Sequence, residues 1–328
     1  MTLPKGKLNL TDLERLVFPH LPRVDDPRKA TLDYTTASVQ GNLFVASDPV
    51  IGVPLQSYGF FAVHYSATDV AMAGVVPQYL NVGIYYPPGT EESWLIKTVQ
   101  QLGQEANRLN IQIIGGHTGG YDGLQLPIIS STCFGILSED LPPPPEIKSG
   151  AVIIAVGPIA RETLWFLANV EPSQVDAILP RTHREALAGD LSPFSVVPLI
   201  NALSKEDVIL MHDLAEGGLA TALQELQTLT GRGITVQYDT IPWDSISLRL
   251  FEYLNWNPFH CSSFGNFLLV TTRDASEKVL ESLSDFGRDV AIIGEFTRKK
   301  RILVEYPDRT KPLDSGRDPY QRFTDKLI

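Results

Sequence analysis

The clearest hydrophobic period in this chain lies between Thr90 and Leu109. Apolar residues recur there at steps of four and three, at Leu95, Val99, Leu102, Ala106 and Leu109. This spacing predicts an amphipathic helix. The preceding segment 78–86 alternates apolar and polar residues, as a strand does. The segment 58–73 is apolar on nearly every face, which predicts a buried helix that ends near Gly74.

Strands and helices alternate through the rest of the sequence, in both halves. We expect further strands at residues 43–46, 111–114, 126–136, 151–156, 208–211, 267–271 and 290–296, and helices at 161–170, 195–203 and 219–229. A capping box at Thr11 and Glu14 predicts a short helix near the N-terminus. The polar residues 305–328 are expected to lie as a tail over the surface.

The organisation into domains follows from length and from one proline run. A chain of 328 residues has the length of about two domains. The four prolines at 142–145 are stiff and extended, and we interpret them as part of a linker. We therefore predict an α/β fold of the α+β type with two α/β domains: an N-terminal domain at 1–141, a linker at 142–150 and a C-terminal domain at 151–328.

Composition removes several classes of protein from consideration. The formal net charge is −11, from 27 Lys and Arg against 38 Asp and Glu, which disfavours binding of nucleic acid through clustered basic residues. Cys133 and Cys261 form no CxxC motif, so a thiolate zinc finger is excluded. The longest apolar stretch, 58–77, contains His64 and Asp69 and is a poor membrane span. No signal peptide is visible, and we expect a cytoplasmic protein that binds neither nucleic acid nor membrane.

Two aspartates stand where a carboxylate is either costly or useful. Asp69 lies in the predicted buried helix, where its charge needs a metal ion or a partner such as an arginine or backbone amides. Asp48 follows a predicted strand and precedes Pro49. Positions at strand ends border ligand crevices in α/β sheets, and they also begin ordinary turns.

A glycine-rich segment, Gly115–Gly120 with the sequence GGHTGG, comes directly after a predicted buried strand. Glycines allow backbone N–H groups to approach phosphate oxygens, and the Thr118 hydroxyl can donate to one of them. The alternative interpretation is a plain flexible turn. His117 by itself is more often a packed or hydrogen-bonded histidine than a ligand.

The strongest candidate site follows a predicted strand in the C-terminal half. His212 and Asp213 come first, then Glu216, and Gly217-Gly218 begins a predicted helix. The free N–H groups and the positive dipole end of a helix N-terminus attract anions. Two carboxylates beside such a site are reasonable if a divalent cation bridges them to a phosphate, because Mg²⁺ prefers oxygen ligands. An N-capping acidic pair is the alternative.

Five short segments together resemble a known family, the aminoimidazole ribonucleotide (AIR) synthetase superfamily. VILMHDLAEGGL at 208–219 is similar to its H-D-x-[ST]-[ED]-G-G-L signature, and SDPVIG at 47–52 to its [ST]-D-P-[IV]-x-G element. ATDVAMAGVVP at 67–77 resembles its N-D-[IV]-A-x-x-G-A-x-P helix, GGHT at 115–118 its G-G-[HED]-T loop, and LDY at 32–34 its first aspartate strand. The segments occur in the family's order.

The resemblance implies a fold, a cofactor and a set of site residues. It implies two α/β domains, a barrel-like homodimer formed by the N-terminal sheets, and a C-terminal domain that covers a cleft where ATP and Mg²⁺ bind. The implied metal ligands are Asp33, Asp48, Asp69 and Asp213. The implied cofactor-binding residues are Asp48, Gly115, Gly116, His117, Thr118, Gly217 and Gly218. The implied catalytic residues are His212, Asp213 and Glu216.

Departures from the family pattern exclude some branches of the superfamily. Thr68 stands where many members have asparagine, and Phe264 replaces an acidic residue common in the hydrogenase-maturation branch. Residues 29–32 lack the glycines of a common strand entry. Selenophosphate synthetases use a cysteine or selenocysteine in an N-terminal loop, but no cysteine precedes Cys133 here. The hydrogenase-maturation dehydratase carries its substrate on a C-terminal cysteine, but this chain ends in Ile328. The branch that remains is the AIR-synthase-related proteins.

The leading hypothesis is an ATP- and Mg²⁺-dependent enzyme that activates a carbonyl or amide oxygen of an unknown small molecule by phosphorylation. One alternative is a non-catalytic nucleotide-binding protein that assists the maturation of another protein. A further alternative is a structural dimer whose cleft no longer binds a ligand.

Overall fold

The computed structural model describes residues 35–39, 41–138, 146–204 and 206–319. They form two compact units. The first, which we call the N-terminal unit, consists of the described residues of 33–143 and 164–203. The second, the C-terminal unit, consists of the described residues of 144–163 and 204–322. The chain passes from one unit to the other inside helix α4 (Arg161–Val170).

Three predictions fall outside the described residues. They are the capping box at Thr11 and Glu14, the aspartate Asp33 and the proline run at 142–145. The role of Asp33 and the proposed domain boundaries therefore stay predictions.

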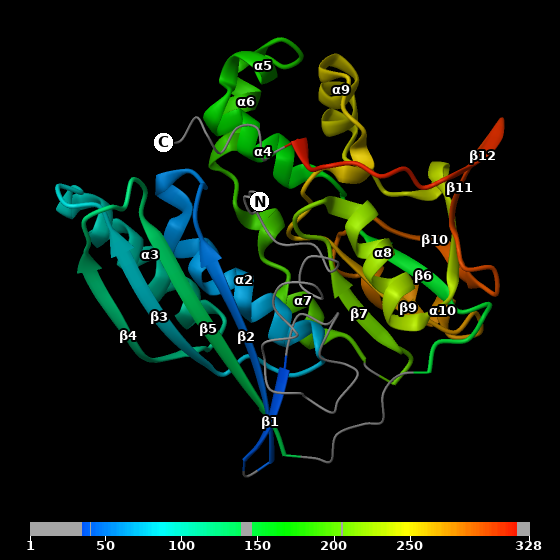
Figure 1. Cartoon of the computed structure of the whole chain (residues 1–328), viewed down its shortest axis with the longest axis horizontal. Coiled ribbons are helices and arrows are strands. Elements are labelled where there is room, and N and C mark those ends of the chain that lie inside the picture. Colours follow the sequence, from blue (N-terminus) through cyan, green and yellow to red (C-terminus); the bar gives the residue numbers. More distant parts are fainter. Residues whose placement is uncertain (1–34, 40, 139–145, 205, 320–328) are drawn as a thin grey trace. The chain divides into compact units, whose positions relative to one another are not determined.

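The N-terminal unit is built on a mixed sheet. Among the described residues this sheet has five strands, in the order β1-β2-β5-β3-β4 (Figure 1). Within it, β3 and β4 pair in parallel and the other neighbours are antiparallel. The strands are β1 (Thr35–Val39), β2 (Gly41–Val50), β3 (Tyr79–Tyr86), β4 (Gln112–Gly120) and β5 (Ile128–Leu137).

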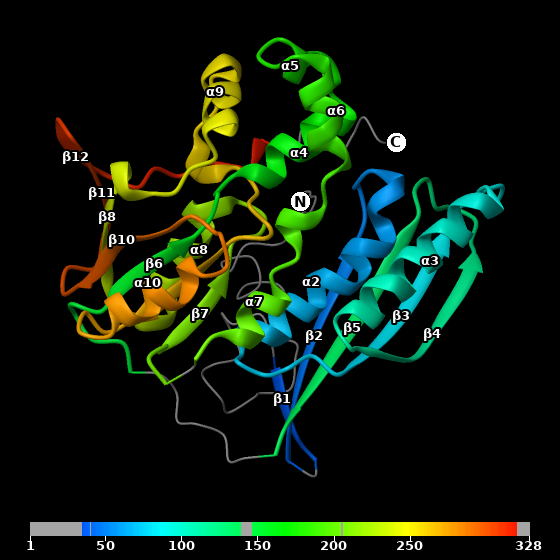
Figure 2. The ribbon, with the colours of Figure 1, turned by 180° about the vertical axis from the view of Figure 1, so that it is seen from behind.

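Two helices, α2 (Tyr58–Met72) and α3 (Glu92–Arg108), lie side by side on one face of this sheet (Figure 2). Helix α2 packs against β2 and β5, and α3 packs against α2. The helices approach closely at Gly59, where a Cβ atom would overlap the carbonyl oxygen of Thr98. Both helices confirm what the hydrophobic pattern predicted.

Shorter helices complete the N-terminal unit. Three aromatic rings, those of Phe61, Trp165 and Phe194, join them to α2 at centroid distances of 5.3 to 5.9 Å. The elements are the second part of α4, α5 (Pro172–Asp176), α6 (Arg181–Gly189), the 3₁₀ helices η3 (Leu55–Ser57) and η4 (Ser192–Phe194), and α7 (Val197–Ala202). Helices α4 and α7 confirm two predicted helices.

The C-terminal unit contains a second mixed sheet. Its order is β12-β11-β8-β10-β6-β9-β7, seven strands in the described part of the chain. Neighbours are antiparallel except β11 and β8. The strands are β6 (Val152–Val156), β7 (Leu210–Asp213), β8 (Gly233–Gln237), β9 (Phe267–Thr271), β10 (Val290–Thr297), β11 (Ile302–Tyr306) and β12 (Arg309–Pro312).

The helices of this unit are α8 (Gly218–Thr230), α9 (Ser245–Leu254) and α10 (Ser276–Ser284), with short 3₁₀ turns η5 (Tyr238–Thr240) and η6 (Pro258–His260). Helix α8 contacts β8, β11 and η6, and α10 contacts β10 and β6. Within the described ranges, no helix combines the length and the apolarity that a membrane crossing requires. The observed fold is thus two α/β units with mixed sheets, as predicted.

Two local predictions in the N-terminal unit were wrong. Asp48 lies inside β2 and not beyond a strand end, because β5 pairs with β2 as far as Val50. The segment Gly115–Gly120 is neither a loop nor a turn but the second half of the edge strand β4. A Cβ atom at Gly116 would overlap the carbonyl oxygen of Val82. Glycine therefore allows the close pairing of β4 with β3.

The predicted polar surface tail at 305–328 is exposed at residues 307–312 and 314–317, but part of it forms strands and its described end is buried. The tail begins in strand β11, continues through β12 and reaches the buried residue Asp318. The hydrophobic pattern missed these strands because β12, an edge strand with the sequence RTKP, is exposed along its whole length.

Candidate functional site

The turn between β7 and α8 has a backbone that only glycine adopts easily. Gly217 is the N-cap of α8 with φ 78°, and Gly218 follows with φ 58°. Residues with a side chain are strained at such positive angles. A Cβ atom at Gly218 would also overlap the carbonyl oxygen of Cys261. The glycine pair is therefore required by backbone conformation and packing, and it puts no side chain of its own at the N-terminal end of α8.

The side chains before this turn are buried. Asp213 closes β7 and is 6% exposed. The Nδ1–H group of His212 donates to the backbone oxygen of Asp213 at 2.8 Å, and its Nε2 atom lies 3.1 Å from the Glu225 carboxylate. Both ring nitrogens of His212 thus face protein atoms.

Two acidic residues join the turn from distant parts of the sequence. The Glu162 carboxylate accepts a hydrogen bond from the Phe264 N–H at 2.7 Å. The Asp318 carboxylate accepts from the Gly217 N–H at 2.9 Å and from the Ser262 hydroxyl at 2.5 Å. Neither acid was among the predicted site residues.

Burial raises the pKa of the Glu162 carboxyl to about 8, although the N–H of Phe264 opposes the rise. The negative charges of Asp318, Glu216 and Asp213 raise this pKa further. We call Glu162, Asp213, Glu216 and Asp318 the carboxylate cluster. At neutral pH, Glu162 therefore holds a proton that it can donate, beside a helix N-terminus that attracts anions.

Sequence signals for the two missed acids were weak. Glu162 stands in the first turn of a predicted helix, where an acidic residue needs no further explanation. Asp318 stands in a polar segment without periodicity. Glu162 reaches the site through its contact with Phe264, 102 residues away in the sequence, and Asp318 through its contact with Gly217, 101 residues away.

In the N-terminal unit, the structure brings Asp48 and Asp69 to neighbouring elements. The Ser131 hydroxyl of β5 donates to the backbone oxygen of Asp48 at 3.5 Å and accepts from the Ser66 hydroxyl of α2 at 3.4 Å. Asp69 follows Ser66 by three residues and lies on the same side of α2. Both aspartates are half-buried.

The glycine strand of the same unit lies farther away. Asp48, Ser131, Val82 and Gly116 form one row across four neighbouring strands. With strands about 4.8 Å apart, the backbone of Gly116 is roughly 14 Å from that of Asp48. His117 is exposed, and its Nε2 atom is 2.6 Å from the Tyr121 hydroxyl. The residues 115–118 and the aspartate pair are therefore separate features of this unit.

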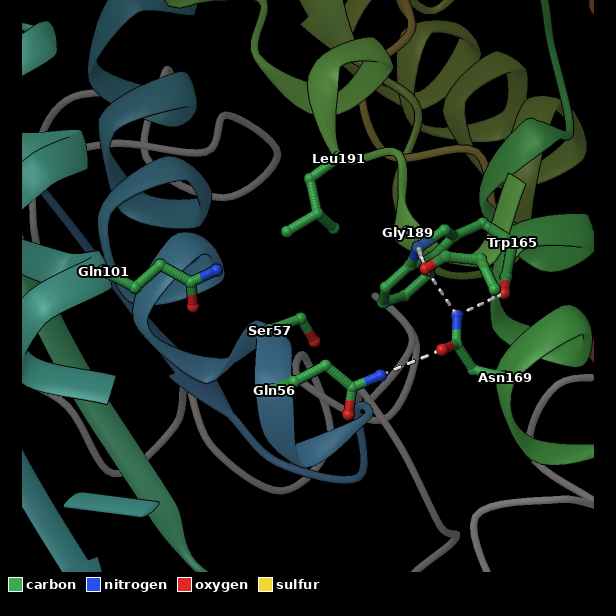
Figure 3. A pocket seen from close by; sticks show the side chains of 8 residues that line it. Gln56, Ser57, Gln101, Trp165, Asn169, Gly189 and Leu191 are labelled. Atoms are coloured by element: carbon green, nitrogen blue, oxygen red, sulfur yellow. Dashed lines mark hydrogen bonds between the residues drawn. The ribbon is translucent and has the colours of Figure 1, made fainter. Parts of the chain in front are cut away.

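The N-terminal unit also contains a cavity of about 320 Å³ (Figure 3). One lining side chain, Asn169, donates to the carbonyl oxygens of Trp165 and Ala188 at 3.0 and 3.1 Å. The Asn169 oxygen accepts from the Gln56 amide at 2.9 Å. Asn169 thus joins α4, α6 and η3, and no predicted site residue lines the cavity.

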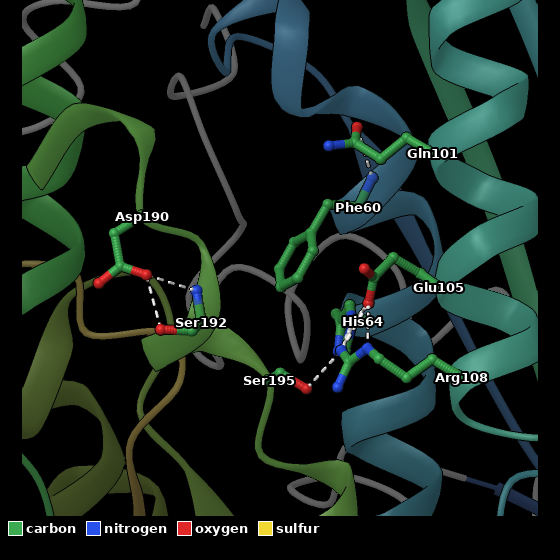
Figure 4. Close-up of polar contacts among 8 residues, drawn as sticks. All are labelled: Phe60, His64, Gln101, Glu105, Arg108, Asp190, Ser192 and Ser195. Carbon is green, nitrogen blue, oxygen red and sulfur yellow. Dashed lines mark hydrogen bonds and ion pairs between the residues drawn. The ribbon is translucent and has the colours of Figure 1, made fainter. Parts of the chain in front are cut away.

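A second polar group of this unit surrounds the fully buried His64 (Figure 4). The ring stacks on Phe60 at a centroid distance of 4.0 Å, and its Nε2 atom lies 2.8 Å from the Glu105 carboxylate. Arg108 binds Glu105 and donates to the Ser195 hydroxyl at 2.7 Å. Burial lowers the pKa of His64, and the hydrogen bond from His64 lowers the pKa of Glu105. The positive charge of Arg108 thus compensates the negative charge of Glu105.

The donor atoms suit a magnesium nucleotide. Within the described ranges, no three Asp, Glu, His or Cys side chains converge closely enough to hold a metal ion by themselves. Mg²⁺ does not need such a cage, because one or two carboxylates hold it together with water and substrate phosphates. Within the C-terminal unit, Asp213 and Glu216 supply carboxylate oxygens of this kind, and within the N-terminal unit Asp48 and Asp69 do so separately.

Comparison with known protein families gives two matches along the chain. Residues 30–137 match the N-terminal domain of AIR synthase related proteins, and residues 148–306 match the C-terminal domain of the same family.

Individual relatives agree with these matches. The carbamoyl dehydratase HypE of Escherichia coli is 25% identical over 312 residues, which cover 90% of this chain and 88% of HypE. A HypE–HypF complex contains a chain with a TM-score of 0.79 at 21% identity, covering 93% of this chain and 99% of the other. HypE in complex with ATP has a TM-score of 0.72 at 21% identity and covers 97% of each chain. The structural likenesses show a shared fold.

Proposed function

The chain belongs to the AIR synthase related protein family, and from this premise we propose that it is an ATP- and Mg²⁺-dependent enzyme that phosphorylates a carbonyl or amide oxygen of a small molecule. The E. coli relative is named as a carbamoyl dehydratase, and a HypE of the same fold binds ATP. These names support an ATP-dependent reaction on a compound with a carbonyl group.

The observation that carries the proposal is the β7–α8 turn. The N-terminal end of α8 has backbone N–H groups beside Asp213 and Glu216, and one of them, that of Gly217, already donates to a carboxylate, that of Asp318. Nucleotide phosphates suit the N–H groups, and Mg²⁺ suits the carboxylates. Within the N-terminal unit, Asp48 and Asp69 carry carboxylates that also suit Mg²⁺, and Gly115, Gly116, His117 and Thr118 are a separate set of proposed phosphate- or substrate-binding residues. Mg²⁺ would supply charge neutralisation on the phosphates.

The residues of the chain have distinct tasks in this reaction. The γ-phosphoryl group of ATP moves to the substrate oxygen, the bond to ADP breaks, and ADP leaves. The Gly217 N–H would stabilise negative charge on a phosphate oxygen. Glu162 carries a proton at neutral pH because its pKa is about 8, and it would donate this proton to the β-phosphate oxygen of the departing ADP. An amide substrate would lose its N–H proton to water.

Nucleotide binding and turnover test the proposal together. A thermal-shift titration with ATP and Mg²⁺ should raise the Tm of the full chain, because a ligand that binds only the native state stabilises it. Asp69→Asn should reduce this shift, whereas Asp122→Asn, an exposed substitution in the same unit, should not. Release of ADP with amides and carbamoyl compounds then reports turnover. The proposal fails if purified, folded protein shows no shift with ATP and Mg²⁺.

A second candidate function is a nucleotide-binding accessory protein without catalysis. It is favoured by His212, whose two nitrogens are engaged with Asp213 and Glu225. A relative is found in complex with HypF, and a partner protein would suit such a role. This candidate predicts a Tm shift with ATP but no ADP release with any carbonyl compound, with or without a partner.

We also propose that the N-terminal sheet mediates a homodimer. Its edge strand β4 exposes two large apolar side chains, Ile113 at 42% and Ile114 at 54%. Sedimentation should show a dimer, and Ile114→Asp should shift it toward a monomer without loss of folding. A wild-type chain that sediments as a monomer at micromolar concentration would contradict this proposal.

A further inference from the structure

A carboxylate from the end of the described chain fills the N-terminal end of α8. The Asp318 oxygen Oδ2 accepts from both the Gly217 N–H and the Ser262 hydroxyl, and Asp318 is only 5% exposed. Gly217 is an N-cap residue with no side chain that could cap the helix itself. A residue 101 positions away therefore supplies the cap.

The segment 313–319, which we call the strap, is held along its path to this point. The Asp314 carboxylate accepts from the Asn257 amide at 3.0 and 3.1 Å and lies 3.2 Å from the Nε2 atom of His260. Gly316 crosses the His260 ring so closely that a Cβ atom there would overlap it. The strap thus lies on η6, which itself contacts α8.

We propose that the strap is an autoinhibitory contact in which the Asp318 carboxylate occupies the position that a nucleotide phosphate takes in the filled site. The inference rests on the function proposed above, because it requires a phosphate at α8. Carboxylate and phosphate oxygens are both anionic acceptors for the same N–H and hydroxyl donors. The Gly217 N–H cannot serve both fully, so phosphate binding requires release of Asp318.

The surroundings of Asp318 favour replacement of its carboxylate by a phosphate over a permanent contact with α8. Its charge lies close enough to Glu162 to raise the pKa of that carboxyl, as do the charges of Asp213 and Glu216. Like charges in a poorly solvated region repel one another. A phosphate that arrives with a divalent cation escapes this repulsion and has an advantage over Asp318. Strap residues 314–317 are exposed and only its last two residues, Asp318 and Pro319, are buried, so release of the strap uncovers a short buried stretch.

The test compares two strap variants with a matched control. Asp318→Asn removes the charge and keeps the shape, and Asp318→Ala removes the acceptor. Asp308→Asn removes the same charge from the exposed turn between β11 and β12. Calorimetric titration of the full chain measures the Kd for ATP with Mg²⁺ and for tripolyphosphate, at one ionic strength.

We expect both Asp318 variants to bind each ligand about tenfold more tightly than the wild type, because only the open fraction of molecules accepts ligand. Asp308→Asn should bind as the wild type does. Without ligand, the Gly217 amide should exchange its hydrogen faster in Asp318→Ala, since its acceptor is gone.

The possible outcomes separate this inference from the proposed function. If the wild type binds ATP and the Asp318 variants bind it equally or more weakly, the strap inference alone is overturned. If no variant binds either ligand, the proposed function fails and the strap inference fails with it. Binding by the Asp318 variants alone supports both, because the wild-type strap would then keep the site closed.

Discussion

Each unit contains one group of titratable side chains around a buried member, His64 in the N-terminal unit and Glu162 in the C-terminal unit, and the two groups meet the cost of burial in different ways. In the N-terminal unit, His64, Glu105 and Arg108 pair opposite charges at short distances. In the C-terminal unit, the carboxylate cluster places like charges near one another, and Glu162 stays protonated. The first arrangement is typical of a structural network. The second is unfavourable without a ligand or a proton, which is typical of a functional site.

The difference appears in the directions of the pKa shifts. Burial lowers the pKa of His64, and its hydrogen bond lowers that of Glu105, so the network is most stable with a neutral histidine and an ionised glutamate. Burial raises the pKa of Glu162, so the carboxylate cluster is most stable with this acid protonated. The two units should therefore respond oppositely to pH.

The largest expected effect is that of Glu162→Gln on the C-terminal unit. Between the usual value of 4.5 and the native value of about 8, the native state holds a proton that the unfolded chain releases. The wild type therefore loses stability as pH rises through this range. Gln cannot ionise and keeps an oxygen for the Phe264 N–H. At pH 8.5 we expect the variant to be more stable by about 5 kcal/mol, because each unit of difference between the native and unfolded pKa is worth roughly 1.4 kcal/mol.

Hydrogen exchange in β6 and β9 measures this stability in the C-terminal unit alone. The control is Glu277→Gln, an exposed substitution in α10, which should change little. Near pH 4 the difference between wild type and Glu162→Gln should vanish. A variant that is no more stable than the wild type at pH 8.5 would mean that Glu162 is not held protonated.

The next effect is that of Glu105→Ala on the N-terminal unit. The substitution leaves the buried His64 Nε2–H without its acceptor, and an unsatisfied buried polar group costs about 2 kcal/mol. The matched control, Gln104→Ala, changes the exposed neighbour in the same helix. Denaturant unfolding, monitored by hydrogen exchange in α2, should show a lower unfolding free energy for Glu105→Ala only. Equal stability of the two variants would show that the network contributes nothing.

A smaller effect is the response of the N-terminal unit to mild acid. The native pKa of His64 lies below its usual 6.5, so the unfolded chain takes up a proton first as pH falls through 6.5. The unit should then lose about 1 kcal/mol per pH unit, while the C-terminal unit gains stability through Glu162. Exchange in α2 and β6 between pH 7 and 5.5 should show these opposite slopes. Slopes of the same sign would remove the contrast between the units.

The smallest effect is expected for Ser195→Ala. Its hydroxyl accepts from Arg108, whose side chain is 44% exposed, and water can replace a partner at such a position. The unfolding free energy should fall by about 0.5 kcal/mol. A loss above about 1.5 kcal/mol would place Ser195 among the main contributors to the network.

Periodicity was enough to predict the main helices and strands. Helix α3 follows from a regular apolar stripe, of which Leu102 and Ala106 are buried and Val99 is exposed. Helix α8 follows from its apolar stripe and from Gly231, which ends it with a positive φ. Such signals are local, because a helix or a strand repeats its environment every few residues.

The site was only partly predictable, because its contacts join distant residues. Asp213, Glu216 and Gly217 stand together in the sequence and could be found there. Glu162 and Asp318 reach the same turn only through long-range packing. The GGHTGG segment misled because glycine serves both loops and close strand pairs, and only the pairing of Gly116 with Val82 distinguishes them.

The most direct test is a calorimetric titration with ATP and Mg²⁺ of one variant from each titratable group. Asp213→Asn changes the carboxylate cluster, and Glu105→Ala changes the structural network. We expect Asp213→Asn to weaken ATP binding at least about tenfold, or 1.4 kcal/mol, and Glu105→Ala to bind ATP as the wild type does despite its lower stability. Wild-type affinity in Asp213→Asn, or an equal loss in both variants, would contradict the assignment of the carboxylate cluster as the functional site.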